Sequence, residues 1–156
     1  MANWFECKIR YDKLQDNGTA VKKTTESFLV DALSFTEAEA RIIEERQPFI
    51  SGEFSVTAVK RTKIAEIFYS DDETADKWYQ VKWLITTLDE KPTALGKPAV
   101  EKKVSVLSMV QAADFRSALD GFNEGMKNTL ADYDIAAINE TTILDVYPVK
   151  QPSDNK

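Results

Sequence analysis

The chain has 156 residues, of which 43% are hydrophobic and 29% are charged, and its formal net charge is −6. This composition is typical of a globular protein rather than a disordered or fibrous one, and the acidic balance excludes a global basic field that would attract nucleic acid. The sequence has no histidine and one cysteine, Cys7. An intramolecular disulfide and a four-cysteine zinc site are therefore excluded.

The first two predicted elements form a β-hairpin. Polar and apolar residues alternate over residues 4–11, as expected for a half-buried strand. Asp16-Asn17-Gly18 predicts the turn, because Asn and Gly both tolerate positive φ. The partner strand is predicted over residues 21–33 and begins with the pair Lys22-Lys23.

A helix is predicted to follow the hairpin. Ser34 has the chemistry of an N-cap, and Glu37 completes a capping box three residues later. Phe35, Ala38 and Ile42 recur at helical spacing, and Pro48 ends the pattern.

The next segment is strand-like and has two possible forms. Strand patterns cover residues 53–59 and 64–68, with Lys60-Arg61-Thr62-Lys63 between them. The sequence leaves open whether this is one long bulged strand or a hairpin. Lys60 and Arg61 are poor turn formers, which favours the bulge.

The order of elements then repeats after a polar, acidic linker over residues 69–76. Residues 30–38 and 110–118 share Val, Ala, Phe and Ala at matched positions, 80 residues apart as in Phe35 and Phe115. Residues 4–9 match residues 78–83 at a shift of 74, and residues 54–68 match residues 133–147 at a shift of 79. The second hairpin loop, at 89–100, is longer than the first, which accounts for the growth of the shift from 74 to 80. Asp114 is the predicted cap of the second helix. Its apolar stripe is Phe115, Ala118, Leu119, Phe122 and Met126.

The predicted fold is α+β, a tandem duplication of a strand-strand-helix-long strand unit with antiparallel sheet(s), two helices and pseudo-twofold symmetry. Repeat one covers residues 1–70, repeat two covers residues 77–148, and residues 149–156 form a flexible tail. One repeat buries only a marginal core. We therefore expect the two repeats to share a core within one compact domain and not to fold independently.

Four stretches resemble a known family: residues 28–41, the opening Trp4-Phe5-Glu6-Cys7-Lys8, the turn over residues 50–54 and the closing Asp145-Val146-Tyr147-Pro148. They resemble an uncharacterised family of Bacteroidetes and their bacteriophages, domain of unknown function 4494, over roughly Trp4 to Pro148. The resemblance implies a bacterial or phage cytoplasmic protein. It implies no activity, cofactor or catalytic residue.

The residue types argue against catalysis. Without histidine, the commonest general base and metal ligand is missing. None of the five glycines stands in a phosphate-binding run, and Cys7 alternates onto the apolar face of its strand. The acidic residues of the linker could hold a hard cation, but they lack the glycine of a calcium loop, which favours a solvated segment. They are Asp71, Asp72, Glu73 and Asp76. We predict a protein that is not an enzyme and has no cofactor and no metal site.

The best functional candidate is the polar face of the first strand in each repeat. Trp4 and Lys8 in one repeat match Trp78 and Lys82 in the other, and an aromatic plane beside a cation is how sheets bind single-stranded DNA or RNA. Basic clusters begin the neighbouring strands and interrupt the long strand. The candidate residues are Trp4, Lys8, Arg10, Lys22, Lys23, Lys60, Arg61, Lys63, Trp78, Lys82, Lys102 and Lys103.

Two alternatives stand beside nucleic-acid binding. Trp4 and Trp78 could instead cover the edge of the core or lie between the repeats, and solvent-facing lysines need no ligand. The protein could also be an interaction or scaffold module, since long edge strands can pair with a partner or with another copy. The N-terminus lacks the pattern of a secretory signal, and no apolar run is long enough to span a membrane. We therefore expect a cytoplasmic location and no membrane partner.

Overall fold

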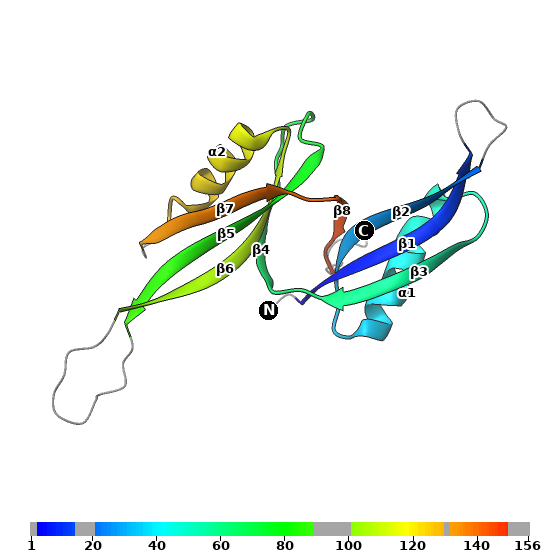
Figure 1. Cartoon of the computed structure of the whole chain (residues 1–156), viewed down its shortest axis with the longest axis horizontal. Coiled ribbons are helices and arrows are strands. Elements are labelled where there is room, and N and C mark those ends of the chain that lie inside the picture. Colours follow the sequence, from blue (N-terminus) through cyan, green and yellow to red (C-terminus); the bar gives the residue numbers. More distant parts are fainter. Residues whose placement is uncertain (1–2, 15–20, 89–100, 130–131, 150–156) are drawn as a thin grey trace, which may run out of the picture. The chain divides into compact units, whose positions relative to one another are not determined.

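The computed structural model describes residues 3–14, 21–88, 101–129 and 132–149 of the chain (Figure 1). The predicted turn at Asp16-Asn17-Gly18, the loop 89–100 and most of the predicted tail lie outside these ranges. The elements are β1 (Trp4–Leu14), β2 (Val21–Asp31), α1 (Phe35–Arg46), the 3-10 helix η1 (Gln47–Phe49), β3 (Phe54–Arg61), β4 (Ile64–Phe68), β5 (Lys77–Leu88), β6 (Glu101–Ala112), α2 (Phe115–Met126), β7 (Tyr133–Glu140) and β8 (Ile143–Tyr147).

The chain forms two compact units, each with one four-stranded sheet and one α-helix. Unit 1 consists of Met1–Lys63 together with Thr142–Lys156, and unit 2 consists of Ile64–Thr141. The strand order is β3-β1-β2-β8 in unit 1 and β4-β6-β5-β7 in unit 2. This architecture confirms the predicted α+β class with two helices.

The predicted long strand at the end of each repeat is wrong in both of its forms, the bulged strand and the hairpin. β3 pairs with β1 in unit 1, but β4, which follows after only Thr62 and Lys63, pairs with β6 in unit 2. In the same way β7 pairs with β5 in unit 2, and β8 pairs with β2 in unit 1. The two repeats therefore exchange their last strands.

A threonine marks the point where each repeat leaves its own sheet. The Thr62 N–H and hydroxyl both donate to the carbonyl oxygen of Trp4, at 2.9 and 2.7 Å. Thr141 makes the same two bonds to the carbonyl oxygen of Trp78, at 2.9 and 2.8 Å. These bonds complete the pairing with the first strand, and the next strand then joins the other sheet.

The exchanged strands make both sheets mixed rather than purely antiparallel, which corrects the prediction. β2 pairs with β8 in parallel and β6 pairs with β4 in parallel, while the other pairs are antiparallel. The parallel ladders have matching registers, since Val30 lies opposite Tyr147 and Val110 lies opposite Phe68. The backbone of the two units can therefore be compared residue by residue.

Each helix starts as its sequence predicts. The Glu37 N–H donates to Ser34 Oγ at 3.1 Å. The Glu37 carboxylate accepts from the N–H of Leu33 at 3.3 Å, whereas the predicted capping box would use the N–H of Ser34. Asp114 Oδ1 accepts from the N–H of Ser117 at 2.8 Å, and this bond is the main reason why the pKa of Asp114 is lowered. Both predicted N-caps are confirmed.

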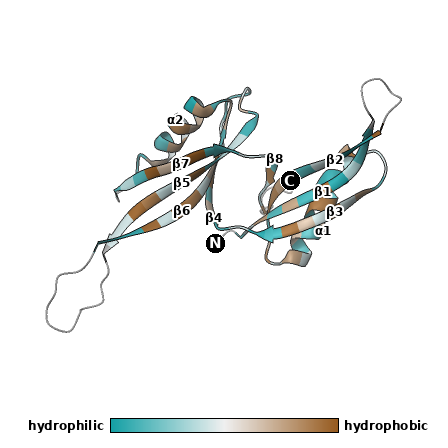
Figure 2. Ribbon diagram, viewed as in Figure 1, coloured by the Kyte–Doolittle hydropathy of each residue, from teal (hydrophilic) through white to brown (hydrophobic). Residues whose placement is uncertain are grey.

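Hydrophobic and hydrophilic residues alternate along the strands (Figure 2), and the hydrophobic set of each sheet faces its helix. In unit 1, Phe5, Cys7 and Ile9 pack with Ala38 and Ile42 of α1. The other face of each sheet is called here the helix-free face. Alternation places Lys8 and Arg10 on the helix-free face of unit 1.

The core of unit 2 is built around aromatic residues. Val81, Trp83 and Phe122 lie in it, with Phe68 and Tyr133 packed against it. The Trp83 Nε1–H donates to Ser108 Oγ at 3.0 Å, and both side chains are buried. Unit 1 has Phe28 at the position of Ser108 and Ile9 at the position of Trp83. The small serine thus accompanies the large indole and also supplies its hydrogen-bond acceptor.

Replacing Ser108 by alanine is expected to lower the free energy of unfolding by about 1–3 kcal/mol, because the buried indole N–H of Trp83 would lose its acceptor. The measurement is urea unfolding followed by tryptophan fluorescence. Ser105→Ala is the control, since Ser105 is exposed on the same strand. Equal unfolding midpoints for the two variants would contradict a stabilising role for the bond.

Candidate functional site

The two tryptophans proposed to stack on bases are covered in this structure. Trp4 is 5% exposed and Trp78 is 3% exposed. The Trp78 ring also meets Tyr69 edge to face, with centroids 5.8 Å apart. Neither ring offers an open face to a base, which counts against stacking on nucleic-acid bases.

The predicted basic residues are divided between two faces of each sheet. In unit 1, Lys8, Arg10, Lys23 and Lys60 share the helix-free face, because the strand registers place them on alternating positions of the same parity. Lys22 and Arg61 lie on the opposite face. Arg61 places its guanidinium over the rings of Phe5 and Phe35, at 5.4 and 5.9 Å. In unit 2, Lys82 and Lys103 are on the helix-free face, Lys102 is on the other, and Lys63 lies between β3 and β4.

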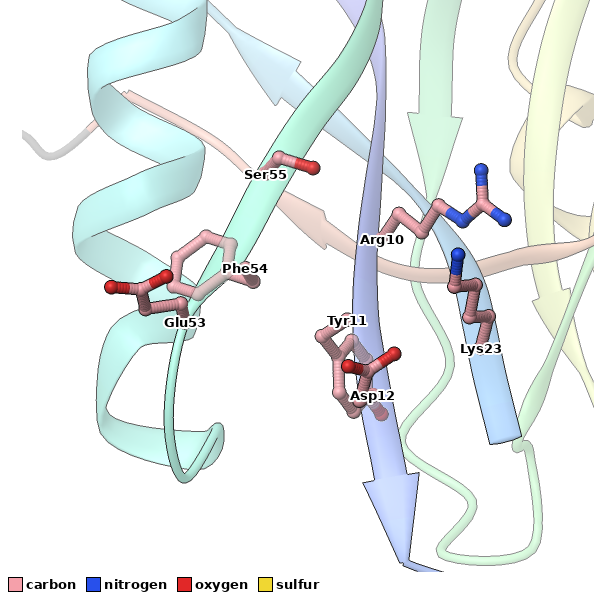
Figure 3. Close-up of a pocket in the computed structure, with 7 residues that line it drawn as sticks. All are labelled: Arg10, Tyr11, Asp12, Lys23, Glu53, Phe54 and Ser55. Atoms are coloured by element: carbon pink, nitrogen blue, oxygen red, sulfur yellow. The ribbon is translucent and has the colours of Figure 1, made fainter. Parts of the chain in front are cut away.

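A shallow pocket of about 380 Å³ opens beside this basic face of unit 1 (Figure 3). Arg10 and Lys23 line it, and Figure 3 shows both side chains extending to the same side of the sheet. Asp12 and Glu53 also line it, so two carboxylates accompany the two cations. On the same face, Lys8 lies 4.0 Å from the carboxylate of Glu6. Because acids and bases alternate here, the pocket offers little net attraction for an anion.

A part-buried polar cluster lies on the helix-covered face of the sheet in unit 1. Arg46, at the end of α1, donates to Tyr147 Oη at 3.1 Å and lies 4.0 Å from Glu26. Its guanidinium also covers the ring of Phe28, at 4.6 Å. Burial raises the pKa of Tyr147, and the bond from Arg46 partly opposes this shift.

Unit 2 has apolar residues at the same positions, Met126 for Arg46, Val106 for Glu26 and Phe68 for Tyr147. The polar cluster of unit 1 therefore occupies the place of an apolar contact in unit 2, and we interpret its role as structural.

Arg41, which the sequence analysis did not single out, holds the exchanged strand β8 in unit 1. Its Nη1 donates to the carbonyl oxygen of Asp31 and, at 3.5 Å, to that of Tyr147, and its Nη2 donates to the carbonyl oxygen of Pro148 at 2.9 Å. One guanidinium thus links α1, the end of β2 and the end of β8. A positive group beside several carbonyl dipoles is a favourable charge-assisted arrangement.

Unit 2 has a cleft where unit 1 has Arg41. Gly121 takes the place of Arg41, and the cleft that it lines has a volume of about 420 Å³. Gln111, Phe68 and Tyr69 line it too, and they correspond to Asp31, Tyr147 and Pro148, whose carbonyls Arg41 contacts in unit 1.

Glycine and phenylalanine shape one wall of this cleft. A Cβ on Gly125 would lie 2.6 Å from Cδ1 of Phe68, so the ring packs directly on the helix backbone. Phe68 also meets Phe122 edge to face, with centroids 5.7 Å apart. The wall is therefore continuous with the core of unit 2 and rests on rigid elements.

The margin of the cleft is acidic. Asp71, Asp72 and Glu124 are among its lining residues, and all three are exposed. The pKa of Asp72 is lowered, first by the backbone N–H of Thr74 and then by its hydroxyl, which donate to Asp72 Oδ1 at 2.9 and 2.8 Å. Glu124 pairs with Lys127 at 2.7 Å. Among the residues that the structure describes, Asp71 and Asp72 form no ion pair with a lysine or arginine.

Two other features bear on chemistry. The thiol of Cys7 is buried, and burial raises its pKa to about 11, so it is protonated at neutral pH and a poor nucleophile. Among residues 3–14, 21–88, 101–129 and 132–149, no cluster of three or more potential His, Cys, Asp or Glu ligands is arranged to hold a metal ion. Within the same residues, no helix combines the length and apolarity that a membrane crossing requires.

Comparison with protein families gives a match over most of the chain. The family model described as a domain of unknown function (DUF4494) matches residues 3–149. A search of the curated proteins found no match.

Proposed function

The chain belongs to the DUF4494 family, a domain of unknown function, and we propose that it is a non-enzymatic protein-interaction module. The cleft of unit 2 receives a segment of a partner polypeptide. Its aromatic wall supplies apolar contact area, and its acidic margin supplies orientation, which is the usual division of roles in a binding site. On the resemblance alone, we also propose a cytoplasmic location in bacteria or their phages.

The observation that carries this proposal is the difference between the two units. Their registers and helix caps correspond, yet unit 1 fills this position with Arg41 and unit 2 leaves a cleft of about 420 Å³. Core positions elsewhere replace one side chain by another, as Phe28 and Ile9 are replaced by Ser108 and Trp83. Here Gly121 provides no side chain in exchange, so the space is available to a ligand.

Single-stranded nucleic acid is the second candidate, and the shared face of Lys8, Arg10, Lys23 and Lys60 favours it. Phosphate neutralisation by such a face needs no exposed tryptophan. The intervening Glu6 and Asp12 and the burial of Trp4 count against it, so we rank it below polypeptide binding.

A displayed library of random dodecapeptides, selected on the whole protein, tests the proposed function. Selected peptides are expected to bind wild type but to lose about tenfold or more in affinity for Gly121→Leu, which fills the cleft with an uncharged side chain. Asp120→Leu is the matched control, because Asp120 is an exposed neighbour on α2 that is not among the cleft residues. Selection of no binders, or binders that Gly121→Leu does not affect, would overturn the proposal.

Fluorescence anisotropy with a labelled single-stranded DNA tests the second candidate function, nucleic-acid binding. Binding that weakens steeply with salt and falls in Lys8→Gln and Arg10→Gln would favour nucleic acid. We expect no such binding, and Gly121→Leu should leave any residual signal unchanged.

A further inference from the structure

We propose that the cleft of unit 2 recognises a guanidinium group, the side chain of an arginine on the partner polypeptide. This inference rests on the proposed function and names the chemistry of the group that anchors the partner. Unit 1 supplies the argument, because it holds a guanidinium of its own at the corresponding place.

The first step is that the two units have matching strand registers and helix caps around this position. The parallel ladders pair Val30 with Tyr147 in unit 1 and Val110 with Phe68 in unit 2, and both ladders have an irregularity near their start. The helices begin from equivalent caps, Ser34 and Asp114. The helix position of Arg41 is therefore the helix position of Gly121.

The second step is what the guanidinium does in unit 1. Arg41 reaches three carbonyl oxygens, those of Asp31, Tyr147 and Pro148, from the end of β2 and from the end of β8 and beyond. A planar group with several N–H donors suits such a set of acceptors, whereas an ammonium is a point charge with three donors in another geometry. The carbonyl oxygens in unit 1 thus fit an arginine side chain in shape as well as in charge.

The third step is that the corresponding residues of unit 2 line the cleft, and that Gly121 stands where unit 1 has Arg41. Gln111, Phe68 and Tyr69 correspond to the three residues that Arg41 contacts, and all three line the cleft with Gly121. A Cβ on Gly121 would approach only Val110 Cγ1, at 3.4 Å, so a side chain there is sterically acceptable. The absence of a side chain is therefore not forced by close packing.

The fourth step is charge. The carboxylates of Asp71, Asp72 and Glu124 line the cleft, and none of the described residues that line it is a lysine or an arginine. The ring of Phe68 adds an aromatic wall, which attracts cations in its own right. An incoming guanidinium would thus meet carboxylates and an aromatic surface, and an anion would be repelled.

The test is an NMR titration of the ¹⁵N-labelled whole protein with three capped tripeptides, acetyl-Gly-Xaa-Gly-amide, in which Xaa is arginine, lysine or citrulline. Citrulline has nearly the shape of arginine without its charge. We expect amide shifts at Gly121, Gly125 and Gln111, with lysine binding about fivefold more weakly than arginine and citrulline more weakly still. Equal binding of the three peptides, or shifts confined to other residues, would overturn the inference.

Gly121→Arg provides an independent readout, because it would place the guanidinium of unit 1 into unit 2. It is expected to abolish the arginine titration and to melt at a higher temperature than Gly121→Ala, the control for the helix propensity gained on removing glycine. Gly121→Ala should retain arginine binding. A Gly121→Arg variant that still binds the arginine peptide would overturn the inference, and the wild-type titration stands whether or not this variant folds.

The outcomes separate this inference from the proposed function. Selected dodecapeptides that need the open cleft but show no preference for arginine would overturn the guanidinium assignment and leave polypeptide binding supported. If the selected peptides that lose affinity for Gly121→Leu contain arginine, the result would support both the guanidinium assignment and polypeptide binding. If no peptide binds the cleft, both are overturned.

Discussion

A fragment of residues 64–141 is expected to fold on its own, whereas a fragment of residues 77–148, which is repeat two by sequence, is expected not to. The first contains all four strands of its sheet, β4-β6-β5-β7, together with α2. The second lacks β4 and so loses Phe68 from its core, and it carries β8 without the strand that β8 pairs with. Far-ultraviolet circular dichroism, urea unfolding and NMR dispersion of the two fragments would measure the difference.

The control for this prediction is a chain that ends at residue 141. It lacks β8, which is the parallel partner of β2 and contributes the buried side chain of Val146. Unit 1 should then unfold while the resonances of unit 2 persist, and a peptide of residues 142–149 added in excess should restore unit 1. Cooperative folding of the 77–148 fragment as a monomer would contradict the exchange of strands, because that fragment follows the sequence repeat instead.

Most single elements could be predicted because their signals are local. The alternation over residues 4–11 and the caps at Ser34 and Asp114 depend on neighbouring residues only, and the structure confirms them. The duplication was also visible, because matching positions recur along the whole chain. Local chemistry thus supports the elements and their order, and the α+β class follows from the two together.

The exchange of strands could not be predicted, because alternation identifies a strand and not its partner. β3 and β4 are separated by only Thr62 and Lys63, and neither is a turn-forming glycine or proline that would have marked a break. What ends β3 is a pair of bonds from Thr62 to the carbonyl oxygen of Trp4, a contact between residues far apart in sequence. Both forms considered for this segment assumed that the chain stays within one sheet.

The exposure of the two tryptophans could not be predicted either, for a related reason. Alternation correctly separates Trp4 from Phe5 and Cys7, which face α1. It does not say whether the helix-free face is open at that point, and Trp4 is 5% exposed. The identity of a face is a local property, whereas its exposure depends on everything that packs near it.

The candidate site was present in the sequence as a mismatch. Aligning the repeats places Gly121 against Arg41, but most mismatches between repeats are ordinary changes of packing. This mismatch acquires meaning only when Arg41 is seen to contact three carbonyls whose counterparts line a cleft. A difference between repeats is therefore informative where the surrounding backbone is the same.

Phe122→Ala is expected to lower the free energy of unfolding by about 3–5 kcal/mol, the usual cost of deleting a fully buried aromatic side chain. Phe122 is 0% exposed, and its ring contacts three others, Phe68, Trp83 and Tyr133, with centroids 5.7, 6.1 and 5.8 Å apart. The pairs with Phe68 and Tyr133 are edge to face and the pair with Trp83 is tilted, and such aromatic pairs add to the free energy gained by burying the ring. Urea unfolding followed by tryptophan fluorescence and by hydrogen exchange of unit 2 amides would measure the loss.

Phe115→Ala is the matched control, because it removes the same ring from the same helix at a position that is 55% exposed. Its cost should stay below about 1 kcal/mol, since little apolar area is returned to water. The distinction also bears on the cleft. Phe68 packs on both Phe122 and the backbone of Gly125, so the loss of Phe122 should loosen the cleft wall and weaken any peptide that binds there. Similar unfolding energies for the two variants would contradict the aromatic core described for unit 2, and unchanged peptide affinity in a folded Phe122→Ala variant would show that the wall does not depend on it.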